Sequence, residues 1–216
     1  QLKLAVSKAI KNFVSGGGFM FAMCSATDSY DIALAAEGVD ICAAYFDGDA
    51  DDPNADSKLN FANTFAFKDF SLIRDPMVYE FSTIDNSMGR KVLPEQDYFN
   101  LFDFSAKWDP IPTMLTQDHT RVIKGFYGQT TGFKKHLIKP DVVIMGENKE
   151  IREAKYLHGV FGKGFWTFYG GHDPEDYQHT VGEEPTDLAL HPNSPGFRLI
   201  LNNILFPAAK KKKQKT

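Results

Sequence analysis

The order of segments in residues 2–36 constrains the fold most. Residues 2–14 carry apolar side chains at helical spacing, and the glycine-rich run Ser15–Gly18 ends that helix. The next five residues, Phe19–Met23, are all apolar with no polar alternation, which is typical of a strand covered on both faces. A sharp turn and a second helix through residue 36 are predicted to follow. Helix, buried strand and helix in this order indicate a doubly wound α/β fold.

The rest of the chain supplies further strands and a final helix. Asp141–Gly146 is predicted to be a buried strand, and Val160–Tyr169 a strand pair or bent strand with a glycine turn. A C-terminal helix is predicted over Phe197–Phe206, and Pro207 closes it. We therefore predict a flavodoxin-like three-layer sandwich with a mostly parallel, doubly wound sheet. We expect its first strand or two to lie upstream of Gln1.

Composition is consistent with one domain that has a sizeable core. The chain has 216 residues, of which 43% are apolar and 19 are Phe. We predict a single domain over residues 1–209 and a basic, disordered tail over residues 210–216. The net charge of -4 gives no general attraction to nucleic acid. No stretch reaches the roughly 18 consecutive apolar residues that a membrane-spanning helix needs.

Cys24 stands where the buried strand turns into the second helix. A side chain there lies at the edge where open α/β sheets bind ligands, and the N-terminus of the helix favours a thiolate. Ala22 and Ala26 are small, as a tight nucleophile elbow requires. We predict Cys24 as a nucleophile, with the backbone N–H of Ser25 as an oxyanion donor. The alternative is a cysteine that only packs, which is our interpretation of Cys42.

A cysteine nucleophile needs a base, and the base needs an acidic group to orient it. His172 is the candidate base, because it follows a predicted strand and its glycine neighbours permit close approach. Asp173 and Glu175 are the candidate acids. His119 and His158 are the alternative histidines, although either could be a hydrogen-bonded structural residue.

Three more residues belong to the predicted binding region. Thr27 and Asp28 follow the cysteine turn, where either could cap the second helix, and Gly171 precedes the candidate base. A metal site is the competing interpretation of the loop that follows the last strand. Its candidate ligands are His172, Asp173, Glu175, Asp176 and His179. They lack a recognised zinc spacing, so we expect neither a metal nor another cofactor.

Three segments resemble those of ThuA-like (trehalose utilisation) proteins. Phe13–Ser29 is similar to the glycine-rich strand and turn of that family, whose turn often carries His in place of Cys. Gly162–Asp173 is similar to the closing strand with its G-H-D end, and Phe197–Phe206 to the C-terminal helix. The class I glutamine amidotransferases share the sheet of these proteins.

The resemblance implies a chemistry. In class I glutamine amidotransferases a cysteine at the elbow attacks the glutamine amide, and a later His-x-Glu completes the triad. Cys24 and His172 match that chain order, whereas Pro174 stands where the acid is expected and Asp173 and Glu175 flank it. The implied function is a glutamine amidotransferase-like hydrolase that cleaves an amide.

The alternative is a non-catalytic ThuA-like protein that binds a sugar-derived ligand. Trp166, Tyr169 and Tyr177 could stack on a sugar ring, although aromatic residues more often fill the core. Either way we expect a small-molecule partner, no nucleic acid and no membrane span, and we leave a homo-oligomer open. A soluble, cytoplasmic protein is the preferred interpretation, although the compartment is unresolved.

Overall fold

A computed structural model describes residues 2–87, 89–104, 111–115, 120–178, 180–205 and 207. The α-helices are α1 (Leu2–Ser15), α2 (Ser25–Ala35), α3 (Ala44–Asp47), α4 (Ala55–Lys58), α5 (Ile111–Leu115) and α6 (Pro195–Leu205). Short 3-10 helices are η1 (Phe61–Asn63), η2 (Pro94–Gln96), η4 (Lys135–Leu137) and η5 (Leu188–Leu190). The strands are β1 (Phe19–Met23), β2 (Tyr98–Leu101), β3 (Val122–Lys124), β4 (Phe133–Lys134), β5 (Val143–Asn148), β6 (Glu153–Phe161) and β7 (Gly164–Tyr169).

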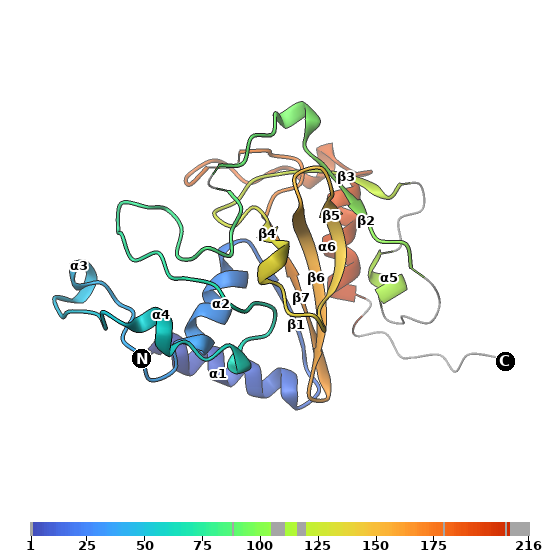
Figure 1. Cartoon of the computed structure of the whole chain (residues 1–216). Helices are drawn as coiled ribbons and strands as arrows, with labels where there is room; N and C mark the ends of the chain where they lie inside the picture. Colours follow the sequence, from blue (N-terminus) through green and yellow to red (C-terminus); the bar gives the residue numbers. More distant parts are fainter. Residues whose placement is uncertain are drawn as a thin grey trace.

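These strands form one sheet with the order β1-β7-β6-β5-β2-β3, and β4 pairs with β6 (Figure 1). Within the part of the chain that the structure describes, β1 and β7 are the parallel pair and every other pairing is antiparallel. The α/β class is therefore confirmed, but the sheet is not mostly parallel as predicted. The physical reason is the shortness of the turns around β6, because parallel neighbours need a long crossover connection.

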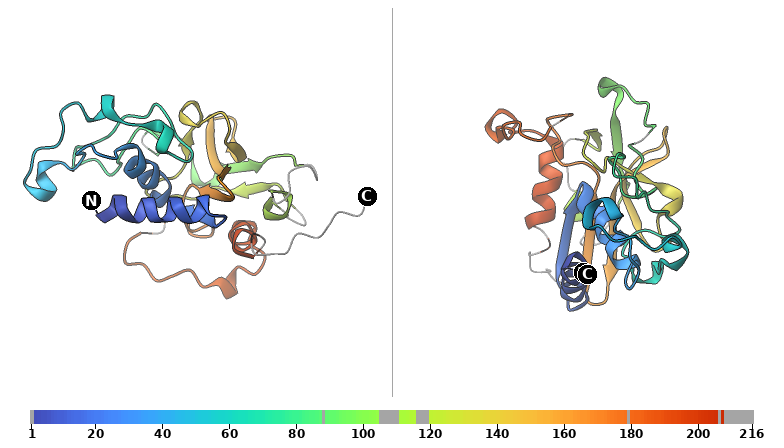
Figure 2. Two further views of the ribbon diagram at one scale, coloured as in Figure 1. Left: turned by 90° about the horizontal axis from the view of Figure 1, so that it is seen from below. Right: turned by 90° about the vertical axis from the view of Figure 1, so that its left-hand side faces the viewer.

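The buried faces of the sheet are covered from both sides. Figure 2 shows α1 and α2 on one side and α6 on the other. One apolar cluster includes Val14 of α1 and Ile32 of α2, packed with Trp166 and Phe168 of β7. The second cluster brings residues of α5 and α6 against the opposite face, where Tyr169 is buried. The all-apolar sequence of β1 follows from this, because alternate residues contribute to different clusters.

The local predictions are largely confirmed. The first helix ends at Ser15 and β1 has the predicted bounds, and the glycine turn predicted within Val160–Tyr169 joins β6 to β7, although β6 begins at Glu153, before the predicted range. The last helix ends at Leu205, while Phe206 and the basic tail lie outside the described residues. The prediction that Cys42 is a core residue is wrong. Its side chain is half-buried in the segment after α2, where the chain has left the sheet.

No helix in the described ranges is both long and apolar enough to cross a lipid bilayer. The long segment between α2 and β2 contributes Phe65 and Phe67 to the first apolar cluster and is also held to the domain by polar contacts. The most buried of these contacts involves Asp31 of α2, whose exposed fraction is 0%. Its carboxylate accepts hydrogen bonds from the backbone N–H groups of Phe65 (2.7 Å), Ala66 (2.7 Å) and Phe67 (2.9 Å). This carboxylate therefore fastens the segment that covers the first apolar cluster.

Replacement of Asp31 tests this attachment. We expect Asp31→Ala to lower the free energy of unfolding by about 3 kcal/mol or more, because three buried N–H groups lose their acceptor. The measurement is urea denaturation followed by circular dichroism. Asp56→Ala is the matched control, since the Asp56 carboxylate accepts from Leu72 N–H at an exposed position, and we expect a loss below about 1 kcal/mol. Equal losses in the two variants would contradict the assignment.

Candidate functional site

The parallel pairing of β1 with β7 brings the two ends of the predicted site together. Their register runs from Phe19 opposite Phe165 to Met23 opposite Tyr169. The Cys24 N–H continues this ladder by donating to the Tyr169 carbonyl at 3.0 Å. Because the strands are parallel, the segments that follow β1 and β7 leave the sheet at the same edge. Cys24 therefore meets the turn that leads from Tyr169 to His172.

The backbone of Cys24 has the conformation of a sharp elbow. Its φ is 53° and its ψ is -139°, a region that residues other than glycine rarely occupy. Such a conformation costs on the order of 1–3 kcal/mol and is concentrated at functional sites. The α2 helix begins directly after it, at Ser25, so the first backbone N–H groups of the helix lie beside Cys24.

The predicted N-cap of α2 is wrong. The N-cap position is occupied by Cys24 rather than by Thr27 or Asp28, because the elbow itself ends β1 and starts the helix. The Thr27 hydroxyl donates to the Cys24 carbonyl at 2.7 Å, and this hydrogen bond stabilises the elbow. Thr27 and Asp28 are 0% and 2% exposed. They can therefore act on a ligand only through other residues.

A loop that the sequence analysis did not identify lies against the thiol. We call residues 126–131 the thiol loop. The Gln129 N–H donates to Cys24 Sγ at 3.1 Å. A β-carbon placed on Gly128 would lie 2.8 Å from Cys24 Sγ and 3.0 Å from His172 Nδ1. The sulfur and the imidazole nitrogen therefore flank the same glycine and are no further apart than these two distances combined.

Cys24 and His172 both open into one cleft of about 810 Å³. Its lining comes from the elbow, the thiol loop, the segment before β2 and the loop after β7. The lining residues are Cys24, Ser25, Tyr79, Glu80, Ser87, Tyr127, Gly128, Gln129, Thr131, His172, Gln178, Thr180, Val181 and Gly182. The structure thus joins the predicted nucleophile, the predicted base and the predicted oxyanion donor in one cleft.

The two candidate acids make other contacts. The Asp173 carboxylate accepts from the backbone N–H groups of Glu175 (3.0 Å) and Asp176 (3.2 Å) and from the Thr186 hydroxyl. Glu175 lies 3.5 Å from His191 Nδ1. These contacts shape the loop that follows His172. The choice between Asp173 and Glu175 as the orienting acid stays a prediction.

The other histidines do not enter this cleft, as far as the structure describes them. His158 is buried in β6, with Nδ1 3.5 Å from the Thr167 hydroxyl, and burial lowers its pKa to about 4. It is therefore a neutral structural histidine. His119 and His179 lie outside the described residues. Within the described ranges, no three His, Cys, Asp or Glu side chains converge to hold a metal ion.

Asp28 lies behind the thiol loop. Its carboxylate accepts from the Thr130 hydroxyl at 3.0 Å, and Thr130 is the residue next to the Gln129 donor. Burial, together with the nearby Asp85 carboxylate, raises the pKa of the Asp28 carboxyl to about 7. The bond from Thr130 acts in the opposite direction. Asp28 therefore changes charge near neutral pH while it holds the thiol loop.

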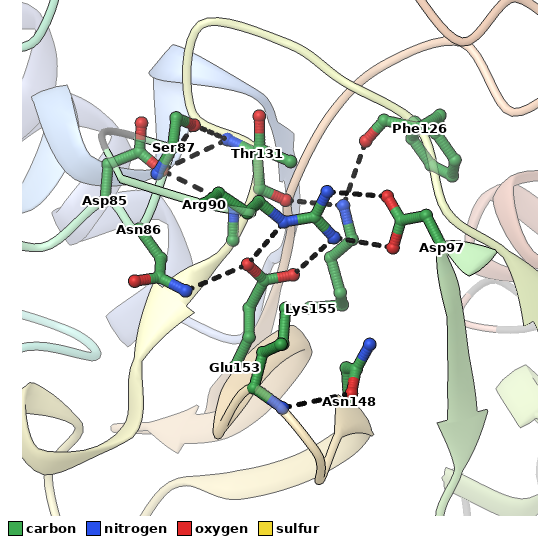
Figure 3. Close-up of polar contacts among 12 residues, drawn as sticks. Asp85, Asn86, Ser87, Arg90, Asp97, Phe126, Thr131, Asn148, Glu153 and Lys155 are labelled. Carbon is green, nitrogen blue, oxygen red and sulfur yellow. Dashed lines mark hydrogen bonds and ion pairs between the residues drawn. The ribbon is translucent and has the colours of Figure 1, made fainter. Parts of the chain in front are cut away.

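A buried ionic network supports the same loop (Figure 3). The Arg90 guanidinium donates two hydrogen bonds of 2.6 Å to Asp97 and bonds of 2.8 and 3.1 Å to Glu153. The side chains of these three residues are at most 1% exposed. Because the pairs are bidentate, the network compensates the cost of burying its charges. Sequence patterns give no sign of it, since its members are scattered over more than 60 positions.

Two of the three aromatic residues proposed to stack on a sugar are core residues. Trp166 and Tyr169 are each 1% exposed and belong to opposite apolar clusters. Tyr177 packs on Tyr127 with 4.3 Å between ring centroids, and Tyr127 lines the cleft. Trp166 and Tyr169 therefore cannot stack on a ligand, because apolar clusters cover both faces of β7.

Substitution of Gly128 tests the close approach of Cys24 and His172. We expect Gly128→Ala to slow the alkylation of Cys24 by iodoacetamide about tenfold at neutral pH, because the new methyl group displaces the sulfur from its hydrogen-bond partner. Gly16→Ala is the control, since its new β-carbon would lie at ordinary van der Waals distances of 3.4 and 3.5 Å from its nearest neighbours. Peptide mass spectrometry separates Cys24 from Cys42. Equal alkylation rates in the variant and the wild type would contradict the geometry.

The raised pKa of Asp28 predicts a pH-dependent stability. The folded chain retains a proton up to about pH 7, whereas the unfolded carboxyl releases it near 3.8, so wild type loses stability as pH rises through this window. Asp28→Asn cannot ionise and keeps an oxygen for Thr130. Its advantage in free energy of unfolding should grow by about 1 kcal/mol per pH unit between pH 5 and 7. Urea denaturation at several pH values measures this, and a constant difference would refute it.

Comparison of the chain with protein-family models, with curated proteins and with solved structures gives no match. The resemblance to ThuA-like proteins and class I glutamine amidotransferases therefore stays a prediction that depends on the residues quoted for it. The site described above has to be interpreted from its own geometry.

Proposed function

We propose that this protein is a hydrolase that cleaves an amide through Cys24. The observation that carries the proposal is the juxtaposition at Gly128, where Cys24 Sγ and His172 Nδ1 face the same glycine from two sides. The elbow conformation of Cys24 and the start of α2 beside it add to this support. A thiol, an imidazole and helix N–H groups at one cleft are the parts that acyl transfer requires.

Each group has a defined role in the proposed reaction. The Cys24 thiol gives its proton to His172, and the sulfur attacks the amide carbonyl carbon. The carbonyl oxygen becomes an oxyanion, toward which the Ser25 N–H at the start of α2 is the candidate donor. Collapse of this intermediate breaks the C–N bond, and the leaving amine takes the proton from His172. Water then cleaves the thioester, which restores the thiol and releases a carboxylic acid.

The lining of the cleft favours an uncharged amide over a phosphorylated or other strongly anionic substrate. Its described residues supply hydroxyl, amide and backbone groups together with the Glu80 carboxyl, and they include no Lys or Arg. Anionic substrates are usually bound by such cations. The Arg90 guanidinium, which lies over the Tyr127 ring at 5.7 Å, is already engaged by two carboxylates.

The resemblance identified in the sequence agrees with this proposal. In class I glutamine amidotransferases the elbow cysteine attacks a glutamine amide, so glutamine is the first amide to test. We propose that β1, Cys24 and α2 form a strand–elbow–helix nucleophile unit of this type. The parallel pairing of β1 with β7 supports this assignment.

Replacement of Cys24 tests the function. We expect wild type to release ammonia from at least one member of a panel of L-glutamine, L-asparagine and simple amides. Cys24→Ala should lower the rate by at least about a thousandfold, since it removes the nucleophile. Cys42→Ser is the matched control and should retain activity. A glutamine analogue with a diazoketone group, which alkylates active thiols, should add its mass to the Cys24 peptide.

Two outcomes would contradict the proposal. One is a wild-type protein that releases no ammonia from the whole panel and does not react with the diazoketone. The other is a Cys24→Ala variant that hydrolyses the amide as fast as wild type.

A further inference from the structure

Lys155 of β6 is buried directly beneath the thiol loop. Its side chain lies among β-strands, and the residue is 1% exposed. The ammonium group donates to the Phe126 carbonyl at 2.9 Å and to the Thr131 carbonyl at 2.7 Å (Figure 3). These two carbonyls are the first and last of the thiol loop. One cation thus binds both ends of a six-residue segment.

The residues between those two ends touch the proposed nucleophile. Gly128 faces Cys24 Sγ and His172 Nδ1, and the Gln129 N–H donates to the same sulfur at 3.1 Å. The position of this N–H is set by the path of the backbone from Phe126 to Thr131. A movement of either end would change its distance from the sulfur.

The main chain of Lys155 is also linked to the turn that precedes His172, the proposed base. Its carbonyl accepts from the Gly170 N–H at 2.8 Å, two residues before His172. The next N–H, that of Gly171, donates to the Thr130 carbonyl of the thiol loop at 2.8 Å. Lys155 is therefore bonded to the loop that approaches the sulfur and to the turn that carries the imidazole.

We propose that Lys155 is a positioning residue that holds the Gln129 N–H against Cys24 Sγ. It does not touch the substrate. It acts through the two carbonyls at the ends of the thiol loop and through the turn before His172. This inference rests on the proposed function of Cys24 as a nucleophile, but its test measures the thiol itself.

The chemistry of lysine suits this position. A flexible four-carbon stem carries three donors, so one ammonium can satisfy two carbonyls that have no strand partner there. Burial of a cation is costly unless opposite charges are near. Glu153, Asp97 and Asp85 offset that cost, although burial still lowers the pKa of Lys155 to about 8. A methionine would fill the same space and supply no donor.

The test compares Lys155→Met with wild type, both in a Cys42→Ser background. We expect the rate of iodoacetamide alkylation of Cys24 at pH 7 to fall about tenfold, the order expected when a thiolate loses one hydrogen bond. The midpoint of the pH profile of alkylation should rise by about one unit. Hydrogen–deuterium exchange of the Gln129 amide should accelerate at least about tenfold, because the loop loses its anchor.

A second variant separates positioning from loss of stability. Asn203→Leu removes another buried donor, which bonds the Leu199 carbonyl at 2.8 Å and the Tyr156 hydroxyl and has no hydrogen bond to the described residues of the thiol loop. It should lower the melting temperature and leave both the alkylation profile and Gln129 exchange unchanged. Should Lys155→Met fail to fold, Lys155→Gln retains a neutral NH2 donor group on a shorter stem and should give intermediate shifts in the same measurements.

The proposal is overturned if folded Lys155→Met keeps the wild-type alkylation profile and Gln129 exchange. It is also overturned if neither Lys155 variant folds, because Lys155 would then be a requirement of the core. Ammonia release is not used in this test. A wild-type protein without amidase activity would remove the proposed function, while the thiol measurements would still decide the role of Lys155.

Discussion

The site depends on the one parallel strand pair in the described part of the sheet. Five residues of β1 are in register with five of β7, and the Cys24 N–H adds a further bond to this ladder. Parallel neighbours end at the same edge, so a thiol and an imidazole nearly 150 positions apart in the chain leave the sheet together. An antiparallel β1 would have placed Cys24 and His172 at opposite ends of β7. The other strands pair antiparallel, and β6 among them carries the buried Lys155 that contacts the thiol loop.

The support of the cleft is electrostatic as much as apolar. The cleft is underlain by buried charges: Arg90 held by Asp97 and Glu153, Lys155 under the thiol loop, and Asp28 against Thr130. Each pays a desolvation penalty that an apolar side chain would avoid. Their common property is that they bind groups of the thiol loop or one another behind the cleft. Directional polar contacts fix a loop of irregular backbone, which apolar packing alone does not do.

The sequence predicted the parts of the fold that depend on local patterns. The bounds of β1 and the pairing of β6 with β7 follow from apolar runs and glycine turns. The direction of the strands could not be predicted, because β6 is buried along most of its length and mixes polar residues such as Lys155 with apolar ones, so its sequence has neither the alternation of a half-exposed strand nor the apolar run of a parallel one. Only the short turn at Gly162 shows that it is part of a hairpin.

The candidate site divides in the same way. Cys24 and His172 were predictable because each follows a strand, where local sequence determines that a side chain leaves the sheet. Gln129 was not, because its N–H reaches the thiol through contacts with Lys155 and Asp28 that are distant in sequence. The position of a side chain at the sheet edge can therefore be predicted from its turn, whereas the backbone groups that contact it depend on tertiary contacts. In this protein, the immediate surroundings of the Cys24 sulfur are set by the thiol loop as much as by the elbow.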